Sequence, residues 1–375
     1  MDMASHPSAG TAPPAIARLA RWTDLAANAA EPNAFYVPDM LDAALEHLAV
    51  QGAVRLIEVQ ADGRTIGLLP VTVSPRHGRL PLACVTNWMH DHCFFGAPLI
   101  RVGHEIAAWR GFLAQLDAAP WAPGFLHVKG LDAAGVSAAA LEALCVEQHR
   151  SRREIHRYDR AMLRSDLSAD AYWETHVRAK KRKEIRRLEK RLAELGAVES
   201  RRLDDRSELT LWCAAFLALE ASGWKGREGS ALDCKPADAA FFRAACAAAF
   251  DAGRLHFLRM DIDGQPIAML VNFRHGAGAF SFKIAFDEQY GRFSPGVLIE
   301  IANLQAVQDD DAIDWMDSCA APDHPMIDSL WAERRSIVQY RIALHGGGTS
   351  RLRRAAADTL ANGVEGLAAR MKGLG

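Results

Sequence analysis

The chain has 375 residues, of which 50% are hydrophobic and 24% are charged, with a formal net charge of −2. These values are typical of a two-domain globular protein and exclude disordered and fibrous classes. The near-neutral charge gives no global attraction to nucleic acid or anionic membranes. No apolar run reaches membrane-spanning length, and the first residues lack a secretory apolar core. Seven cysteines without a CxxC pair indicate reduced thiols, so we expect a cytoplasmic protein.

Composition divides the chain into four predicted segments. Residues 1–15, rich in Ala, Ser and Pro, are expected to form a flexible tail. Residues 16–160 and 161–345 are expected to form two domains, and residues 346–375 an amphipathic tail. The apolar residues that can share one side of a tail helix are Leu352, Leu360, Val364, Leu367, Met371 and Leu374.

Two hairpins are predicted, one in each half. Apolar runs 54–60 and 65–73 flank Asp62-Gly63, and runs 255–262 and 266–273 flank Asp263-Gly264. Asp-Gly between such runs is a strong hairpin signal. Because the pattern recurs after 201 residues, it indicates a weak internal repeat and two related halves.

The second half alternates helices with short strands. The predicted helices are 178–195, 207–222, 237–252, 296–308 and 325–335, and the further strands are 279–287, 312–317 and 337–344. Hairpin connections together with helices predict an α/β fold of the mixed α+β type. Its sheet is expected to be mostly antiparallel rather than purely parallel.

Residues 280–300 carry the most informative pattern. Phe280, Phe282, Ile284 and Phe286 alternate with polar or small residues, which predicts a strand with two unlike faces. A short loop follows, and Pro295 is placed for the first turn of a helix. A strand, a tight loop and a helix start make an anion site, because free N–H groups and the helix dipole converge there. This pattern points to a nucleotide-like cofactor.

Four segments carry a family resemblance: FFGAPL at 94–99, EASGWKGREGSAL at 220–232, the stretch 283–296, and DSCAAPDHPMIDSLWAERR at 317–335. From about residue 30 to 345 the chain resembles the GNAT acyltransferase superfamily, in the branch named for cellulose-biosynthesis acetyltransferases (CelD/BcsL-like). That branch is similar in build to the Fem peptidyl-transferases, which carry two GNAT-like halves. The resemblance implies a degenerate first GNAT-like half and a catalytic second half.

The resemblance also implies an acyl-CoA donor and no metal. The donor loop maps onto Arg292, Phe293, Ser294, Pro295, Gly296 and Val297, with Lys283 on the strand that leads to it. The usual loop reads Q/R-x-x-G-x-G/A. Pro295 and Val297 replace its first Gly and its small residue, so one fewer N–H group faces the phosphates.

Two carboxylates are candidates for the general base that deprotonates an amine acceptor. Asp287 shares a strand face with Lys283, and burial would raise its pKa; the alternative is a surface salt bridge. Glu220 precedes Trp224 and Lys225, a segment that borders the acceptor site in the family. The alternative is a helix end whose Trp packs into the core.

Further candidates lie in loops. Tyr290 could protonate the leaving thiolate, or could simply anchor its loop. Asp317 and His324 could form an acid/base pair, and a Cys319–His324 acyl-enzyme is an alternative. Residues 90–93 (HDHC) suggest a metal, but no second pair has zinc-like spacing, so loop histidines near an interdomain cleft are expected instead.

A basic helix opens the second half, with nine Lys/Arg and two Glu between Arg178 and Arg191. Its apolar stripe, Ile185, Leu188, Leu192 and Leu195, predicts one packed face. The charged face is either solvated or binds an anion: CoA phosphates, tRNA as in Fem relatives, or phospholipid headgroups. Together with the C-terminal tail it suggests a peripheral contact with the inner membrane.

The leading hypothesis is transfer of an acyl group from acyl-CoA to an amine. The acceptor is a small molecule or a lipid: an amino sugar or polysaccharide precursor, or a long-chain amine such as a sphingoid base, as in bacterial ceramide synthesis. One alternative is a Fem-like aminoacyl-tRNA-dependent transferase. Another is a non-enzymatic protein that binds anionic surfaces, although the near-neutral charge argues against nucleic acid.

Overall fold

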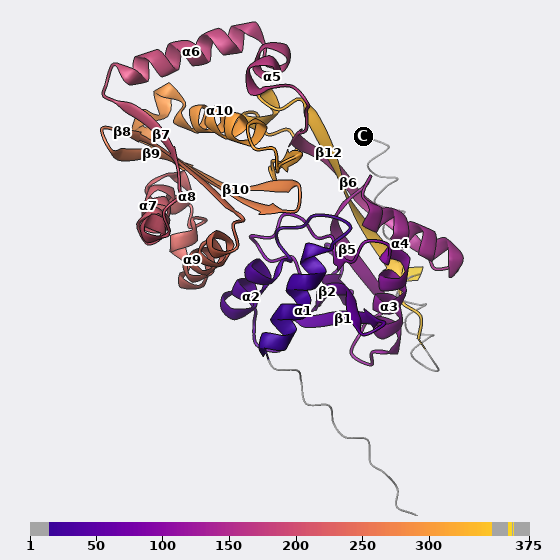
Figure 1. The fold of residues 1–375 in the computed structure, drawn as a ribbon. Helices are drawn as coiled ribbons and strands as arrows, with labels where there is room; N and C mark the ends of the chain where they lie inside the picture. The colour runs from indigo at the N-terminus through magenta and orange to yellow at the C-terminus, as the bar shows by residue number, and fades with distance from the viewer. Residues whose placement is uncertain (1–14, 347–358, 362, 364–375) are drawn as a thin grey trace, which may run out of the picture.

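The computed structural model describes residues 15–346, 359–361 and 363. One 12-stranded sheet runs through both halves, in the order β1-β2-β3-β5-β12-β6-β11-β10-β9-β8-β7, with β4 paired to β2. Most pairings are antiparallel; β3–β5 and β10–β11 are parallel. Figure 1 shows two lobes joined by β6 and β12. The mixed, mostly antiparallel sheet flanked by helices that the sequence predicts is confirmed.

The first half contains four helices and five strands among the described residues. They are α1 (Ala15–Ala27), α2 (Pro38–His47), β1 (Arg55–Ala61), β2 (Arg64–Ser74), β3 (Cys84–Asn87), β4 (Leu99–Ile100), α3 (Glu105–Ala118), β5 (Phe125–Asp132) and α4 (Val136–Glu147). The last strand of the chain, β12, completes the sheet of this half by pairing with β5.

The second half follows from β6 (Arg152–Leu163). Its first helices and strand are α5 (Ala169–His176), α6 (Ala179–Ala193), β7 (Val198–Arg202), α7 (Leu209–Ser222), α8 (Trp224–Arg227) and α9 (Pro236–Asp251). Then come β8 (Leu255–Ile262), β9 (Gln265–His275), β10 (Gly278–Phe286), α10 (Pro295–Gln308), β11 (Trp315–Asp317) and β12 (Glu333–Ala343). Short 3-10 turns are η1 (Arg206–Glu208), η2 (Leu232–Cys234), η3 (Glu288–Phe293) and η4 (Ile327–Ser329).

Both predicted hairpins are confirmed, with the same turn geometry. Asp62 and Gly63 have φ values of 51° and 74°, and Asp263 and Gly264 have 48° and 78°. Two consecutive positive φ values are the signature of the tight turn that matches strand twist, and Asp-Gly tolerates them. The turn chemistry is therefore repeated in the two halves.

Helices cover both faces of the second-half sheet. In Figure 1, α7, α8 and α9 lie on one side of β8–β10, and α10, α5 and α6 on the other. Phe257 packs with Trp212, Phe216 and Phe242 on the first side. On the other side, Leu298, Ile299 and Leu304 of α10 join a second core that includes Ile185 and Leu192 of α6.

Three sequence expectations need correction or fall outside the description. The predicted helix 325–335 is wrong: η4 spans three residues, and Glu333, Arg334 and Arg335 begin β12. Pairing with Met162, Ala161 and Arg160 of β6 supplies the backbone partners that favour a strand there. Most of the C-terminal tail and the first 14 residues lie outside the described residues. The domain boundary at residue 160 falls within β6 and stays a prediction.

A buried group of charges joins the two halves, and we call Asp132, Arg160, Asp317 and Arg335 the junction ion cluster. Asp317 Oδ2 accepts hydrogen bonds from Arg160 Nη2 at 2.7 Å and Arg335 Nη1 at 2.9 Å. Arg335 Nε donates to Asp132 Oδ2 at 2.8 Å. The Arg335 guanidinium also lies over Phe95, 4.1 Å from the ring centroid. The cluster therefore ties β5, β6, β11 and β12 together.

In the part of the chain from residue 15 to 346, no helix has the length and apolar character needed to cross a membrane.

Replacing Asp317 with Asn should lower the free energy of unfolding by about 3–5 kcal/mol, because two buried guanidinium groups lose their shared carboxylate. Burial alone would raise the pKa of Asp317, but Arg160 and Arg335 hold it below its usual value. The contribution of the Asp317 carboxylate to stability is therefore present above its pKa in the unfolded chain, about 4. It is lost as the pH falls through the pKa of Asp317 in the folded protein. Urea denaturation at pH 7 and at acidic pH measures both effects.

Asp314→Asn is the matched control, since Asp314 lies three residues away and is exposed. It should change stability by less than about 0.5 kcal/mol. Equal losses in the two variants would contradict the role of the junction ion cluster.

Candidate functional site

Strands β10 and β11 separate at the centre of the second half. They pair in parallel at three positions, Gly278–Trp315, Ala279–Met316 and Phe280–Asp317. Strand β11 ends at Asp317, whereas β10 continues to Phe286. A cavity of about 450 Å³ opens beyond this point, between β10, the first turns of α10 and residues 318–327. The cavity forms because the two parallel strands β10 and β11 separate.

A bulge in β10 lies on the wall of this cavity. The register with β9 shifts between Ser281 and Lys283, so Phe282 is the extra residue. A bulged residue leaves local backbone groups outside the regular ladder. Such groups can bind a ligand carbonyl that lies along the strand.

The cavity has apolar walls with a few charged groups. Phe282, Ile284 and Phe286 contribute from β10, and Met326 and Ile327 from the opposite loop. The charged or titratable side chains on its lining are Lys225, Lys283, Glu300, Cys319 and His324. An apolar hollow with few polar groups is typical of a small-molecule site.

Glu300 is the notable acid of the cavity. It lies on α10, is 3% exposed and lines the hollow. Burial raises the pKa of Glu300 to about 7, against the smaller opposing effect of a hydrogen bond from Asn303. A carboxyl that titrates near neutrality can exist in both protonation states under working conditions, as a general acid or base requires.

A line of buried amides holds Glu300 in place. Asn303 Nδ2 donates to Glu300 Oε2 at 3.2 Å, and Asn272 Nδ2 donates to Asn303 Oδ1 at 2.8 Å. Asn272 Nδ2 is also 3.4 Å from His256 Nδ1. Asn272, Asn303 and His256 are completely buried. Because these groups lie between α10 and the sheet, they fix the position of the Glu300 carboxyl.

The N-terminus of α10 lies beside the cavity. Ser294 has φ 54° and ψ 53°, a left-handed cap, and Pro295 occupies the first helical position. Gly296 lines the cavity, Phe293 is buried in the core, and Arg292 is exposed. The unpaired N–H groups and dipole of a helix start favour an anion here, although Pro295 contributes no N–H.

Glu220 is buried behind two lysines. Its Oε1 accepts a hydrogen bond from Lys225 Nζ at 2.9 Å and lies 3.9 Å from Lys283 Nζ, and its Oε2 accepts from Leu232 N at 2.8 Å. Lys225 and Lys283 line the cavity, whereas Glu220 does not. Burial lowers the pKa of Lys283 in spite of Glu220. The structure therefore gives Glu220 the role of counter-ion to the cavity lysines.

The acceptor-side aromatic, Trp224, lines the cavity and is 48% exposed. Its backbone N–H donates to Glu288 Oε1 at 2.7 Å, which fixes the start of α8 against η3. The Trp224 side chain can therefore form a wall for a bound group, and it does not pack into the core.

Asp287 and Tyr290 lie outside the cavity lining. Asp287 Oδ1 accepts from Gln289 N at 2.9 Å and caps η3. Tyr290 packs on the core beneath α6 and α10. Asp317 is engaged in the junction ion cluster, beside Cys319, whose N–H it accepts at 2.9 Å. Each of these three predicted site residues thus has other contacts in the structure, and its predicted catalytic role stays a prediction.

His324 and Cys319 do face the cavity. His324 is half-buried on the wall opposite β10. Burial and the Asp317 charge raise the pKa of the Cys319 thiol well above its usual value. Because the thiolate is the nucleophile, this environment disfavours a Cys319 acyl-enzyme.

The histidines of residues 90–93 are held by the second half. His92 Nε2 lies 3.2 Å from Asp238 Oδ2, and its ring stacks on Phe241 with planes 10° apart. Burial lowers the pKa of His90 to about 3. These rings face α9 of the other half, as expected for loop histidines near the junction.

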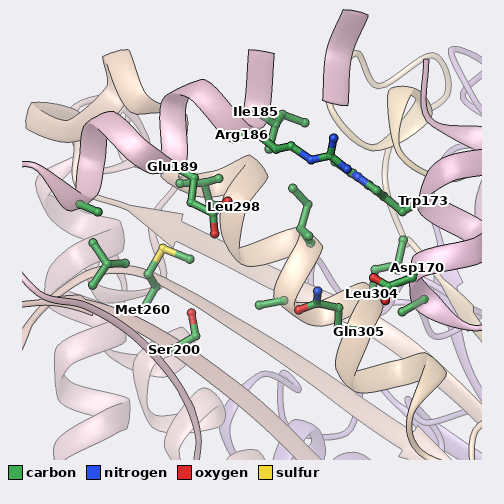
Figure 2. Close-up of a pocket in the computed structure, with 15 residues that line it drawn as sticks. Asp170, Trp173, Ile185, Arg186, Glu189, Ser200, Met260, Leu298, Leu304 and Gln305 are labelled. Atoms are coloured by element: carbon green, nitrogen blue, oxygen red, sulfur yellow. The ribbon is translucent and has the colours of Figure 1, made fainter. Parts of the chain in front are cut away.

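A second cavity of about 490 Å³ lies beneath α6 (Figure 2). Ile185, Met260 and Leu298 form its apolar walls, and Arg186 and Glu189 lie on α6 above them. Arg186 is engaged with Glu174 at 2.8 Å. This cavity is slightly larger, but it has neither the strand separation nor the helix start, so the β10–β11 cavity is the better candidate.

The sequence prediction missed Glu300 because it lies in an apolar helix, PGVLIEIANLQAVQ. One feature of the sequence could have indicated it: Glu300 is a single acidic residue in this run, and Asn303 follows three residues later. Residues at this spacing lie on the same face of a helix.

Comparison with known proteins gives a family for part of the chain. Residues 179–324 match the family model described as acetyltransferase (GNAT) domain. This stretch contains α6, the bulged strand β10, the loop, α10 and β11. No curated protein matches the chain in sequence.

Solved structures share the fold over nearly the whole chain. FemX is 10% identical with a TM-score of 0.54, covering 86% of this chain and 95% of that one. A conserved protein from Bacteroides thetaiotaomicron VPI-5482 is 12% identical with a TM-score of 0.56, covering 88% and 97%. The C-terminal domain of a candidate lysylphosphatidylglycerol synthetase from Agrobacterium fabrum is 10% identical with a TM-score of 0.54, covering 92% and 97%. At such identities the likeness concerns the fold alone. The second half of the chain is thus similar, over residues 179–324, to the acetyltransferase (GNAT) domain family.

Proposed function

We propose that the protein is an acyl-CoA-dependent N-acyltransferase whose reaction takes place in the β10–β11 cavity. One observation carries this proposal: three features border the same cavity. They are the separation of β10 from β11, the bulge at Phe282 and the N-terminus of α10. Together they offer a carbonyl-binding edge and an anion-binding end, which are the two parts of an acyl-CoA that need recognition.

The donor lies with its thioester along β10 and its pyrophosphate toward the start of α10. Backbone groups freed by the bulge polarise the thioester carbonyl. Ser294, Gly296 and Val297 surround the helix start, and exposed Arg292 adds a positive charge beside it. Arg292 offsets in part the N–H group that Pro295 lacks.

Glu300 is the base that we assign to the reaction. The amine nitrogen attacks the thioester carbonyl carbon, the C–S bond breaks, and CoA leaves as a thiolate. Glu300 accepts the proton that the amine loses, and Asn303 holds the carboxyl in place. To His324, which lines the opposite wall, we assign the return of a proton to the leaving sulfur.

The acceptor is an amine that enters beside Trp224. The apolar walls formed by Phe282, Ile284 and Phe286 suit acyl groups and long-chain amines such as a sphingoid base. An amino sugar or polysaccharide precursor is the second class, for which Trp224 offers a stacking face. Contact of α6 with an anionic inner-membrane surface agrees with the lipid class.

A second candidate function is aminoacyl-tRNA-dependent transfer, favoured by the outer face of α6. Lys180, Lys183, Arg187 and Lys190 are exposed there and make no ion pair with the described residues. A stripe of unpaired cations suits a phosphate backbone. Activity that requires charged tRNA and disappears after ribonuclease treatment would establish this function in place of the first.

Binding of the acyl-CoA donor can be measured directly. Calorimetric titration with acyl-CoAs of graded chain length should show one binding site per chain. Ser294→Trp should weaken that binding at least about tenfold, since the larger side chain covers the start of α10. Ser207→Trp, on exposed η1, is the control and should bind as the parent does. No binding of any CoA species would refute the donor assignment.

The proposed role of Glu300 as base predicts how turnover depends on pH. With Glu300 as base, turnover should rise with pH to a plateau, with a midpoint near 7, because the carboxylate must be deprotonated to accept a proton. Glu300→Gln should lower kcat by about 10²–10⁴ and remove this rise, with little change in donor affinity. Asp287→Asn should keep most of the activity, since Asp287 lies outside the cavity. Full activity of Glu300→Gln would exclude Glu300 as base.

The same residue gives a prediction on stability. The folded pKa of Glu300 is raised, so its stabilising effect is complete below the unfolded pKa and declines as pH rises through about 7. At pH 8 Glu300→Gln should therefore be more stable than the parent, by about 3 kcal/mol, and near pH 4.5 the two should be alike. Glu288→Gln should give no such gain, because its Arg227 partner lowers the pKa of Glu288. Urea denaturation of the parent and of both variants, at pH 4.5 and at pH 8, measures these differences in the free energy of unfolding.

A further inference from the structure

Three potential metal ligands lie close together in the first half. They are far in the sequence from the residues that line the β10–β11 cavity. The ligand atoms of His77, Cys84 and His127 all lie within 4.8 Å of one another. Cys84 is 1% exposed and His77 is 7% exposed, and His127 is half-buried. Among the described residues this is the one group of three that meets these distances.

The fold brings the three residues together from separate segments. Strands β3 and β5 pair in parallel with Thr86 opposite His127, and Cys84 precedes Thr86 by two residues on the same face of β3. His77 lies in the β2–β3 connection, where its backbone forms a bridge with Leu80. The His77 and His127 rings meet edge to face, with centroids 5.0 Å apart. No local spacing in the sequence would reveal this set.

We propose that His77, Cys84 and His127 form a binding site for a thiophilic divalent metal ion of the Zn²⁺ class. One thiolate and two imidazoles are ligands that zinc prefers, and three protein ligands leave a fourth position for water. A soft sulfur ligand disfavours Mg²⁺ and Ca²⁺, which take oxygen ligands. Binding converts the Cys84 thiol to a thiolate, and its proton passes to the solvent.

Neighbouring groups support such a site. His127 Nε2 lies 3.0 Å from Gln339 Oε1 of β12, a contact that fixes the orientation of the ring. The Cys84 thiol points toward Arg76 O at 3.8 Å, a weak interaction that a metal bond can replace. Phe125 closes one side, with its ring 5.0 Å from that of His77. A metal here would link the β2–β3 connection to the central strands.

Cobalt substitution tests the site without any assay of activity. The full chain, free of any affinity tag, is reduced, treated with EDTA and titrated with Co²⁺, then with Zn²⁺ in competition. We expect one Co²⁺ per chain, with a thiolate-to-cobalt charge-transfer band and the visible bands of a tetrahedral ion, both displaced by Zn²⁺. Absence of the charge-transfer band in the parent protein would overturn the proposal.

Variants of the proposed ligands, compared with one control variant, test which residues bind the metal. Cys84→Ser should abolish the charge-transfer band, and His127→Gln should weaken Co²⁺ binding by at least about 100-fold, beyond the loss seen on removing an outer-shell partner. Cys234→Ser removes an exposed thiol and should bind as the parent does. A band that survives Cys84→Ser, or that disappears with Cys234→Ser, would place the metal elsewhere. If Cys84→Ser fails to fold, His77→Gln is tested instead; it keeps the thiol and should weaken Co²⁺ binding by at least about 100-fold, as expected for His127→Gln.

Discussion

The junction ion cluster is the constraint on which the rest of the structure depends. A carboxylate with no exposure, Asp317, is shared by Arg160 and Arg335, and Arg335 reaches Asp132 in the other half. Buried charges are costly when they lose a partner, so the four strands that carry these groups must stay in register. Asp317 is also the last residue of β11, at the point where β10 and β11 separate. The same interaction therefore joins the halves and directly precedes, in the chain, Ser318 and Cys319, which line the candidate site.

The candidate site combines groups that differ in charge and in burial. Glu300 lies in an apolar helix, and burial raises its pKa, which costs stability at neutral pH and suits the proton acceptor that we propose. Asn303 and Asn272 hold it without adding charge. Glu220, by contrast, lies beside Lys225 and Lys283, so two carboxylates in one region have different electrostatic environments. The two halves also differ: the candidate catalytic groups lie in the second, while the first carries a histidine–cysteine cluster.

Much of the fold follows from local patterns. Both Asp-Gly hairpins, the alternating strand β10 and the helix begun by Pro295 lie where the sequence places them. Of the candidate site, Lys225, Lys283, Trp224, Gly296 and His324 indeed line the cavity. Motifs bound to one strand, loop or helix start are readable because their geometry depends on neighbours a few residues away.

What the sequence by itself determined is therefore the mixed, mostly antiparallel fold and most of its elements, among them both hairpins and the strand, loop and helix start at residues 279–308. Only the tertiary structure decided that Glu333–Arg335 form a strand, since β6 supplies their partners. It also decided that Asp317 is neutralised by two arginines, that Glu300 faces the cavity, and that His77 meets His127. Each of these depends on residues distant in the chain, and burial and charge pairing are properties of the packed molecule rather than of any local pattern.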